Sequence, residues 1–207
     1  METNVSTVIV VTGASRGIGK AIALSLAAPD TALIINCSKS AGRLELVKEE
    51  IIKKGALCET FVGDVSNYST VNEMFDLAIS IYGKVNVLIN NAGIASIGLF
   101  QDMTPDMWNN IMSVNLNSVY NCCHFAVQDM LRRHCGKIIN ISSVWGLYGA
   151  SCEVAYSATK GAINSFTKAL AKELAPSNIQ VNAIACGAID TEMNGHLSPE
   201  VQVASNY

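Results

Sequence analysis

Short apolar runs rich in β-branched residues recur along the chain and alternate with segments of helical periodicity. The runs are continuously apolar rather than alternating with polar residues, as in Val8–Val11. Strands that are buried on both faces of a sheet have this pattern. It predicts six strands, at Thr7–Thr12, Ala32–Cys37, Leu57–Val62, Val85–Asn90, Lys137–Ser142 and Ile179–Ala185.

The segments between these strands carry apolar residues at helical spacing, and each is long enough to cross back over a sheet. Strands that alternate with helices form parallel sheets, and fully apolar strands require helices on both faces. We therefore predict a doubly wound parallel α/β sheet. The expected helices are Gly17–Ala28, Ala41–Lys54, Tyr68–Tyr82, Pro105–Arg133 and Val154–Ala175.

The segment Pro105–Arg133 is expected to divide into two helices at Ser113–Asn117, because its two Asn residues are weak helix formers. No linker, low-complexity tract or repeat interrupts the chain, so residues 1–207 are assigned to one domain. The tail Cys186–Tyr207 has only scattered apolar positions. A mobile lid, a short helix and a frayed end all remain open for it.

Composition narrows the class of protein further. Half of the 207 residues are hydrophobic and 15% are charged, which indicates a folded chain. The net charge of −3 argues against binding to nucleic acid, and no apolar run is long enough to span a membrane. The N-terminus carries Glu2 where a secretory signal carries Lys or Arg, and its apolar run stops at Gly13 without a cleavage pattern, which favours a cytoplasmic protein.

The cysteines and histidines favour neither a disulfide framework nor a metal site. Seven cysteines is an odd number, and none forms a C-x-x-C pair. The three histidines, His124, His134 and His196, share no metal-ligand spacing. Reduced thiols and no bound metal are therefore expected.

A glycine-rich turn follows the first predicted strand and precedes the first predicted helix. Its glycines are Gly13, Gly17 and Gly19. Such a turn brings backbone N–H groups and a helix N-terminus to a pyrophosphate, and the missing side chains allow close approach. The order of strand, turn and helix favours nucleotide binding over a purely structural turn.

Tyr156 and Lys160 are four residues apart on a predicted helix, so their side chains share one face. A phenol has a pKa of about 10 and exchanges its proton poorly at neutral pH. A neighbouring ammonium favours the phenolate. We therefore expect Lys160 to lower the pKa of Tyr156.

Five motifs in order resemble those of the classical short-chain dehydrogenases/reductases over residues 7–193. The glycine turn matches T-G-x-x-x-G-x-G, Asp64-Val65 matches the D-V pair and Asn90–Gly93 matches N-N-A-G. Tyr156–Lys160 matches Y-x-x-x-K, and Ser143 lies thirteen positions before the tyrosine. The resemblance implies a Rossmann-like fold and a catalytic set of Asn115, Ser143, Tyr156 and Lys160.

The resemblance also implies the role of each catalytic residue. Tyr156 protonates a carbonyl oxygen during reduction, and Ser143 holds that oxygen by a hydrogen bond. Lys160 binds the nicotinamide ribose, and Asn115 anchors a water that relays protons to it. Asn115 can also be read as a helix cap.

The implied cofactor site covers several turns of the chain. Asp64 contacts the adenine ring in this family, although it also suits a helix-start cap. Thr191 matches the family's contact to the nicotinamide amide. The expected cofactor residues are Gly13, Ser15, Arg16, Gly17, Ile18, Gly19, Ser38, Lys39, Asp64, Val65, Asn91, Ala92, Gly93, Tyr156, Lys160, Gly187 and Thr191.

The end of the second strand indicates which nicotinamide cofactor binds. NAD-specific sites place an acid there to bind the ribose 2′-hydroxyl. The stretch 36–40 contains none, whereas Ser38, Lys39 and Arg16 suit a 2′-phosphate. NADP(H) is favoured, with solvated charges as the alternative reading of Arg16 and Lys39.

The substrate is indicated by resemblance alone. The overall pattern is most similar to bacterial 3-oxoacyl-acyl-carrier-protein reductases, which implies NADPH-dependent reduction of a ketone in fatty-acid synthesis. Residues 98–104 and 142–154 are also similar to the reductase of 5-aminopentanone-modified elongation factor P. Glu153, which suits an amine-bearing ketone there, also suits a helix start.

Two departures from the family leave another function class open. Cys186-Gly187 replaces the usual Pro-Gly, and relatives continue beyond residue 207 with a last strand. Without that strand the sheet is expected to end at the sixth, with an unpaired edge. A catalytically inactive NADP-binding or interaction protein is therefore an alternative, and a complete chain is expected to form a homo-oligomer.

Overall fold

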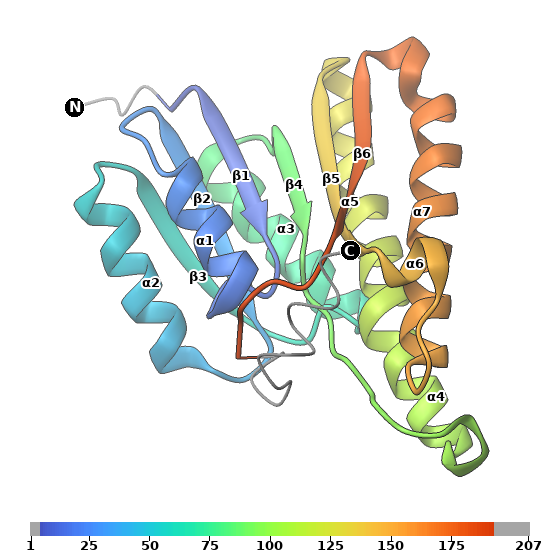
Figure 1. Cartoon of the computed structure of the whole chain (residues 1–207). Helices are drawn as coiled ribbons and strands as arrows, with labels where there is room; N and C mark the ends of the chain where they lie inside the picture. Colours follow the sequence, from blue (N-terminus) through green and yellow to red (C-terminus); the bar gives the residue numbers. More distant parts are fainter. Residues whose placement is uncertain (1–4, 193–207) are drawn as a thin grey trace.

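A parallel sheet forms the centre of the protein in the computed structural model, which describes residues 5–192 (Figure 1). The strand order is β3-β2-β1-β4-β5-β6, and every neighbouring pair is parallel. The predicted Rossmann-like sheet is therefore confirmed. The strands are β1 (Thr7–Val11), β2 (Thr31–Cys37), β3 (Leu57–Val62), β4 (Val87–Asn90), β5 (Gly136–Ser143) and β6 (Ile179–Cys186).

Helices cover both faces of the sheet, and they follow the predicted segments closely. Trp145–Tyr148 and two short 3₁₀ turns, Phe100–Asp102 and Ala175–Ser177, are additions that the apolar periodicity did not predict. The helices are α1 (Gly17–Leu26), α2 (Ala41–Lys53), α3 (Tyr68–Tyr82), α4 (Pro105–Met112), α5 (Ser118–Arg133), α6 (Trp145–Tyr148) and α7 (Val154–Leu174). None of the helices in residues 5–192 is both long and apolar enough to span a bilayer.

Alternate residues of each central strand supply two separate cores. Val10 and Ile34 pack with α3, α5 and α7, whereas Ile9 and Leu33 pack with α1 and α2. All four side chains are at most 3% exposed. Burial of this apolar surface on both faces is the main force that holds the layers together, and it explains the continuous apolar runs.

The predicted break at Ser113–Asn117 is wrong in form. The backbone stays helical between α4 and α5 and makes a π-helical turn, in which the Ser118 N–H donates to the Ser113 carbonyl. The extra residue of this turn shifts the helix by one position without ending it. Asn115, one of the predicted catalytic residues, lies fully buried in the turn.

Strand β6 pairs only with β5 in the described part of the chain, as expected for a sheet that ends at its sixth strand. Its outward positions are open, and Ile184 is half exposed. Residues 193–207, which include His196 and most of the tail for which alternatives were left open, lie outside the described residues.

The strand order reverses between β1 and β4, because the chain builds outward first through β2 and β3 and then through β4, β5 and β6. Loops that leave the carboxyl ends of β1 and β4 turn to opposite sides of this point and leave a crevice. The predicted glycine turn follows β1 at this end of the sheet, and Ser143 ends β5 there.

Candidate active site

A large open cavity occupies the crevice at the carboxyl ends of the strands. Its volume is about 1180 Å³, which exceeds a typical small-ligand pocket of roughly 300–1,000 Å³ and leaves room for two ligands together. It is lined at one side by the turn after β1 and the end of β2, and at the other by Ser143, Tyr156 and Lys160.

The glycine turn forms one wall of the cavity. Gly13 and Gly17 adopt positive φ angles of 65° and 54°, which other residues rarely adopt. Gly19 has a different role, because a Cβ atom there would collide with the Gly13 carbonyl oxygen and the Asn91 side chain. Gly19 therefore lies beneath the turn and allows α1 to approach it.

A hydrogen-bond network ties the glycine turn to the end of β4. The Asn91 side-chain amide donates to the carbonyls of Thr12 and Gly13, each at 3.0 Å. In return the Thr12 hydroxyl accepts from the N–H groups of Asn91 and Ala92, also at 3.0 Å. The predicted N-N-A-G residues thus set the shape of the turn, besides lining the cavity.

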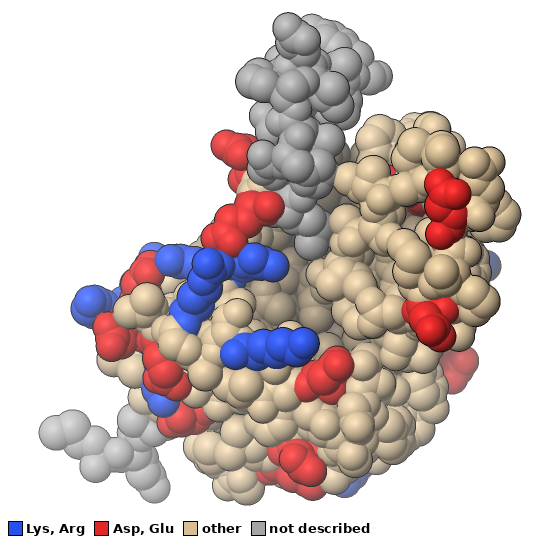
Figure 2. All heavy atoms as spheres, turned by 90° about the horizontal axis from the view of Figure 1, so that it is seen from below, with Lys and Arg blue, Asp and Glu red and all other residues tan. Residues whose placement is uncertain are grey.

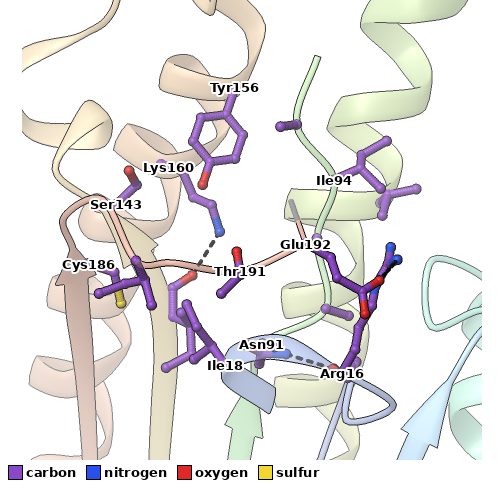
Figure 3. Close-up of a pocket in the computed structure, with 18 of the residues that line it drawn as sticks. Arg16, Ile18, Asn91, Ile94, Ser143, Tyr156, Lys160, Cys186, Thr191 and Glu192 are labelled. Carbon is purple, nitrogen blue, oxygen red and sulfur yellow. Dashed lines mark hydrogen bonds and ion pairs between the residues drawn. The ribbon is translucent and has the colours of Figure 1, made fainter. Parts of the chain in front are cut away.

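Ser143, Tyr156 and Lys160 converge at the other end of the cavity (Figure 3). Ser143 ends β5, while Tyr156 and Lys160 lie one turn apart on α7. Gly146 permits this approach, since a Cβ atom there would lie 2.8 Å from the backbone nitrogen of Gly161 on α7. The short helix α6 therefore packs directly onto the helix that carries the tyrosine and the lysine.

The Lys160 ammonium is almost fully buried and has a defined partner. Its Nζ donates to the Ile141 carbonyl at 2.8 Å and lies 5.5 Å from the centroid of the Tyr156 ring. Burial lowers its pKa to about 8, because a buried charge loses hydration. The lysine therefore changes its charge close to neutral pH.

The expected effect of this lysine on the tyrosine is wrong in this structure. Burial raises the pKa of Tyr156, a hydrogen bond with Ser143 lowers it, and the Glu153 charge raises it again. Burial has the largest effect, and Lys160 is turned toward the Ile141 carbonyl. Tyr156 is consequently a neutral proton donor at neutral pH.

Asn115 is fully buried behind the cavity and holds the loop after β4. Its side chain accepts from the Ile94 N–H at 2.8 Å and donates to the Ile94 carbonyl at 2.9 Å. It also donates to the Thr159 hydroxyl on α7. Asn115 thus joins the π turn, the loop and α7, and its reading as a helix cap is wrong because its side chain bonds to Ile94 and Thr159.

The cavity lining includes most of the predicted cofactor residues. Asn115 and Gly19 are the two predicted site residues that lie behind the lining. Asp64 lines the cavity and accepts from the Ser66 N–H, whereas the residue that caps α3 is Asn67, whose side chain accepts from the Ser69 and Thr70 N–H groups. Those on the lining are Gly13, Ser15, Arg16, Gly17, Ile18, Ser38, Lys39, Asp64, Val65, Asn91, Ala92, Gly93, Ser143, Tyr156, Lys160, Gly187 and Thr191.

Positive charge gathers at the side of the cavity formed by the glycine turn and the end of β2 (Figure 2). Arg16 and Lys39 were predicted there, and the structure adds Arg43 from the first turn of α2. Arg16 and Arg43 both pair with Glu192. No spacing in the sequence predicts a role for Glu192, because its partners lie 149 and 176 positions away.

Glu153 and Cys186 lie at the catalytic end of the cavity. The Glu153 carboxylate is close enough to raise the pKa of Tyr156. The Lys160 ammonium lowers the pKa of the Cys186 thiol. Burial nonetheless raises the pKa of that thiol, so it is protonated at neutral pH.

The fold is of the doubly wound class, with a cavity at the switch point where such folds bind nucleotides. A sequence model of the short chain dehydrogenase family matches residues 7–202. The chain belongs to this family, which acts on alcohol or ketone groups with a nicotinamide cofactor.

Named relatives support the same family. The chain is 40% identical over 192 residues to a 3-oxoacyl-[acyl-carrier-protein] reductase of Staphylococcus aureus strain Mu50, covering 93% of this chain and 78% of that protein. A reductase of the same name from Synechocystis is 38% identical over 193 residues, with the same coverage.

Solved structures share the fold closely. A Sinorhizobium meliloti 1021 protein, provisionally assigned as a short-chain alcohol dehydrogenase, aligns with a TM-score of 0.89 and 31% identity. The alignment covers 97% of this chain and 79% of the other. An NAD⁺-bound xylitol dehydrogenase aligns with a TM-score of 0.83 and 32% identity, over 89% of this chain and 71% of the other.

Proposed function

We propose that the protein reduces a ketone to a secondary alcohol with NADPH, and that its substrate is a 3-oxoacyl thioester on acyl carrier protein. The convergence of Ser143, Tyr156 and Lys160 opposite the glycine turn carries this proposal. The name shared by the Staphylococcus and Synechocystis relatives supports the substrate.

The residues of the cavity fit a dinucleotide. The positive φ angles at Gly13 and Gly17 and the absence of side chains leave room for a pyrophosphate against the first turn of α1. Ser38, Lys39 and Arg16 surround the place for a ribose phosphate at the end of β2. A bound reduced nicotinamide supplies hydride to the carbonyl carbon.

The side chains at the other end handle the proton and the carbonyl oxygen. Tyr156, neutral because burial raises its pKa, donates its proton to that oxygen. The Ser143 hydroxyl holds the same oxygen by a hydrogen bond, which strengthens as negative charge develops. Lys160, whose Nζ lies 5.5 Å from the centroid of the tyrosine ring, would bind the ribose hydroxyls of the nicotinamide as a charged hydrogen-bond donor.

The charge on Lys160 predicts how the reduction depends on pH. Lys160 is protonated below its pKa of about 8 and neutral above it, so kcat/KM for reduction is expected to fall as the pH rises through 8. Lys160→Met is expected to be slower and to lose this fall, while Lys168→Met, which changes an exposed lysine on the same helix, keeps it. A fall near pH 8 that persists in Lys160→Met assigns it to another group.

One observation favours a second substrate class. Glu153 lines the cavity close enough to Tyr156 to affect its pKa. A carboxylate there suits a ketone that carries an ammonium group, such as the 5-aminopentanone group on modified elongation factor P. An acyl chain carries no positive charge that could pair with this carboxylate.

The function is tested by following NADPH oxidation at 340 nm with three substrates. An acetoacetyl thioester, a 5-amino-2-ketone and its uncharged 5-hydroxy analogue separate the two substrate classes. We expect turnover of the thioester with NADPH and much slower turnover with NADH. Faster turnover of the amino ketone than of the hydroxy ketone would favour the second substrate class over the thioester, provided that Glu153→Gln abolishes this difference. No turnover with any of them, despite NADPH binding, favours the inactive alternative.

A further inference from the structure

Two arginines at the nucleotide side of the cavity share one carboxylate. Arg16 Nη1 lies 2.9 Å from Glu192 Oε2, and Arg43 Nη1 lies 2.9 Å from the same oxygen and 3.2 Å from Oε1. The three residues come from the glycine turn, α2 and the segment after β6. Glu192 therefore bridges guanidinium groups from two separate parts of the fold.

This cluster lies where a nucleotide phosphate is expected. Arg16, Arg43 and Glu192 line the same cavity as Ser38 and Lys39, which follow β2. Three cations thus surround one region, and Glu192 is the carboxylate that the structure pairs with two of them. Guanidinium groups bind phosphate in the same fork geometry in which they bind carboxylate.

The segment that carries Glu192 passes over the glycine turn. The Thr191 Cγ2 atom lies 3.6 Å from the position that a Cβ atom would take on Gly17. Figure 3 shows this segment running from Cys186 past Thr191 to Glu192, beside Arg16. The two ion pairs of Glu192 therefore hold the segment across the nucleotide end of the cavity.

We propose that Glu192 competes with the cofactor's ribose 2′-phosphate for Arg16 and Arg43. The phosphate displaces the carboxylate and takes both guanidinium groups. A phosphate carries more charge and more acceptor oxygens than a carboxylate, so it wins the exchange. Glu192 and Arg43 are then specificity-determining residues, and this inference rests on the proposed preference for NADP(H).

Two roles of Glu192 predict opposite changes in phosphate affinity when its carboxylate is removed. If Glu192 only orients the two arginines for the phosphate, its removal weakens phosphate binding. If it competes, its removal strengthens binding. Nucleotide fragments without the nicotinamide separate these cases without any turnover.

The experiment measures dissociation constants by calorimetry for adenosine 2′,5′-bisphosphate and for adenosine 5′-monophosphate. Exposed ion pairs contribute modestly, so we expect Glu192→Gln to bind the bisphosphate about fivefold more tightly. Binding of the monophosphate stays within about twofold. Asp190→Asn removes a nearby exposed carboxylate from the same segment and is expected to change neither constant.

A double variant links the effect to the arginine. Arg43→Gln is expected to weaken bisphosphate binding, and the gain from Glu192→Gln is expected to shrink in the Arg43→Gln background, as for any coupled pair. Equal melting temperatures of the variants show that the fold is retained.

The outcomes separate this inference from the proposed function. Wild-type protein that prefers the bisphosphate, with no gain or a loss in Glu192→Gln, overturns the competition and leaves the NADP(H) preference standing. Wild-type protein that binds both nucleotides equally overturns the NADP(H) preference, and the competition falls with it.

Discussion

Replacement of Tyr156 by Phe is expected to reduce kcat for ketone reduction by about 10³-fold, because a positioned general acid contributes roughly 10²–10⁴-fold. The change removes one oxygen and keeps the ring, which is partly buried beside Lys160 and Ser143. The nearby Ser143 hydroxyl cannot replace the phenol as a proton donor, because its own pKa is far higher. The rate is measured by NADPH oxidation under single-turnover conditions.

The matched control is Tyr148→Phe. Tyr148 ends α6 near the same end of the cavity, but its side chain is 82% exposed, and its loss is expected to leave the rate unchanged. NADPH affinity of Tyr156→Phe is expected to stay within about twofold of wild type, because the ring that contacts Lys160 remains. A Tyr156→Phe enzyme that keeps more than a tenth of the wild-type rate would show that another group delivers the proton.

The fold was largely predictable from the chain because burial acts through local patterns. A strand such as Val8–Val11 is apolar at every position because helices cover both of its faces, and this leaves a continuous run in the sequence. The π turn left no such trace. In it the Ser118 N–H donates to the carbonyl five residues back, at Ser113, instead of four, and common helix residues can make either bond.

The site was predictable where its residues lie close together in sequence. Tyr156 and Lys160 share a helix face, and the glycine turn is one short segment. The bridge between Arg43 and Glu192 joins residues that are 149 positions apart in the sequence, so no local spacing predicts it. The predicted lowering of the Tyr156 pKa is wrong because burial raises it, and that burial comes from the packing of α6 on α7, which spacing on one helix does not reveal.

The buried position of Gly19 leads to the second large effect. Gly19→Ala is expected to weaken NADPH binding by at least about 100-fold, because the new methyl group collides with the Gly13 carbonyl and the Asn91 side chain. Neither neighbour can move freely. The Asn91 amide is held by the carbonyls of Thr12 and Gly13, so a shift of either residue distorts the turn that would hold the pyrophosphate.

Gly42→Ala is the control that separates this collision from a general effect of adding a methyl group to a helix. A Cβ atom at Gly42, on α2, meets nothing within 4 Å. Gly42→Ala is therefore expected to bind NADPH normally and to be stabilised by about 0.4–1 kcal/mol through a less flexible unfolded chain. Gly19→Ala is expected to lose about 1–3 kcal/mol of stability, as other overpacked sites do.

Thermal unfolding and fluorescence titration with NADPH on the two variants separate folding from binding. About 1–3 kcal/mol lowers the melting temperature of a chain of this length by only a few degrees per kcal/mol, so Gly19→Ala remains folded at 20 °C if the wild type melts in the usual mesophilic range. A folded Gly19→Ala that binds NADPH like Gly42→Ala would mean that the cofactor does not depend on the shape of the glycine turn. In that case the close approach of α1 to Gly13 and Asn91, which Gly19 permits, would have no role in cofactor binding.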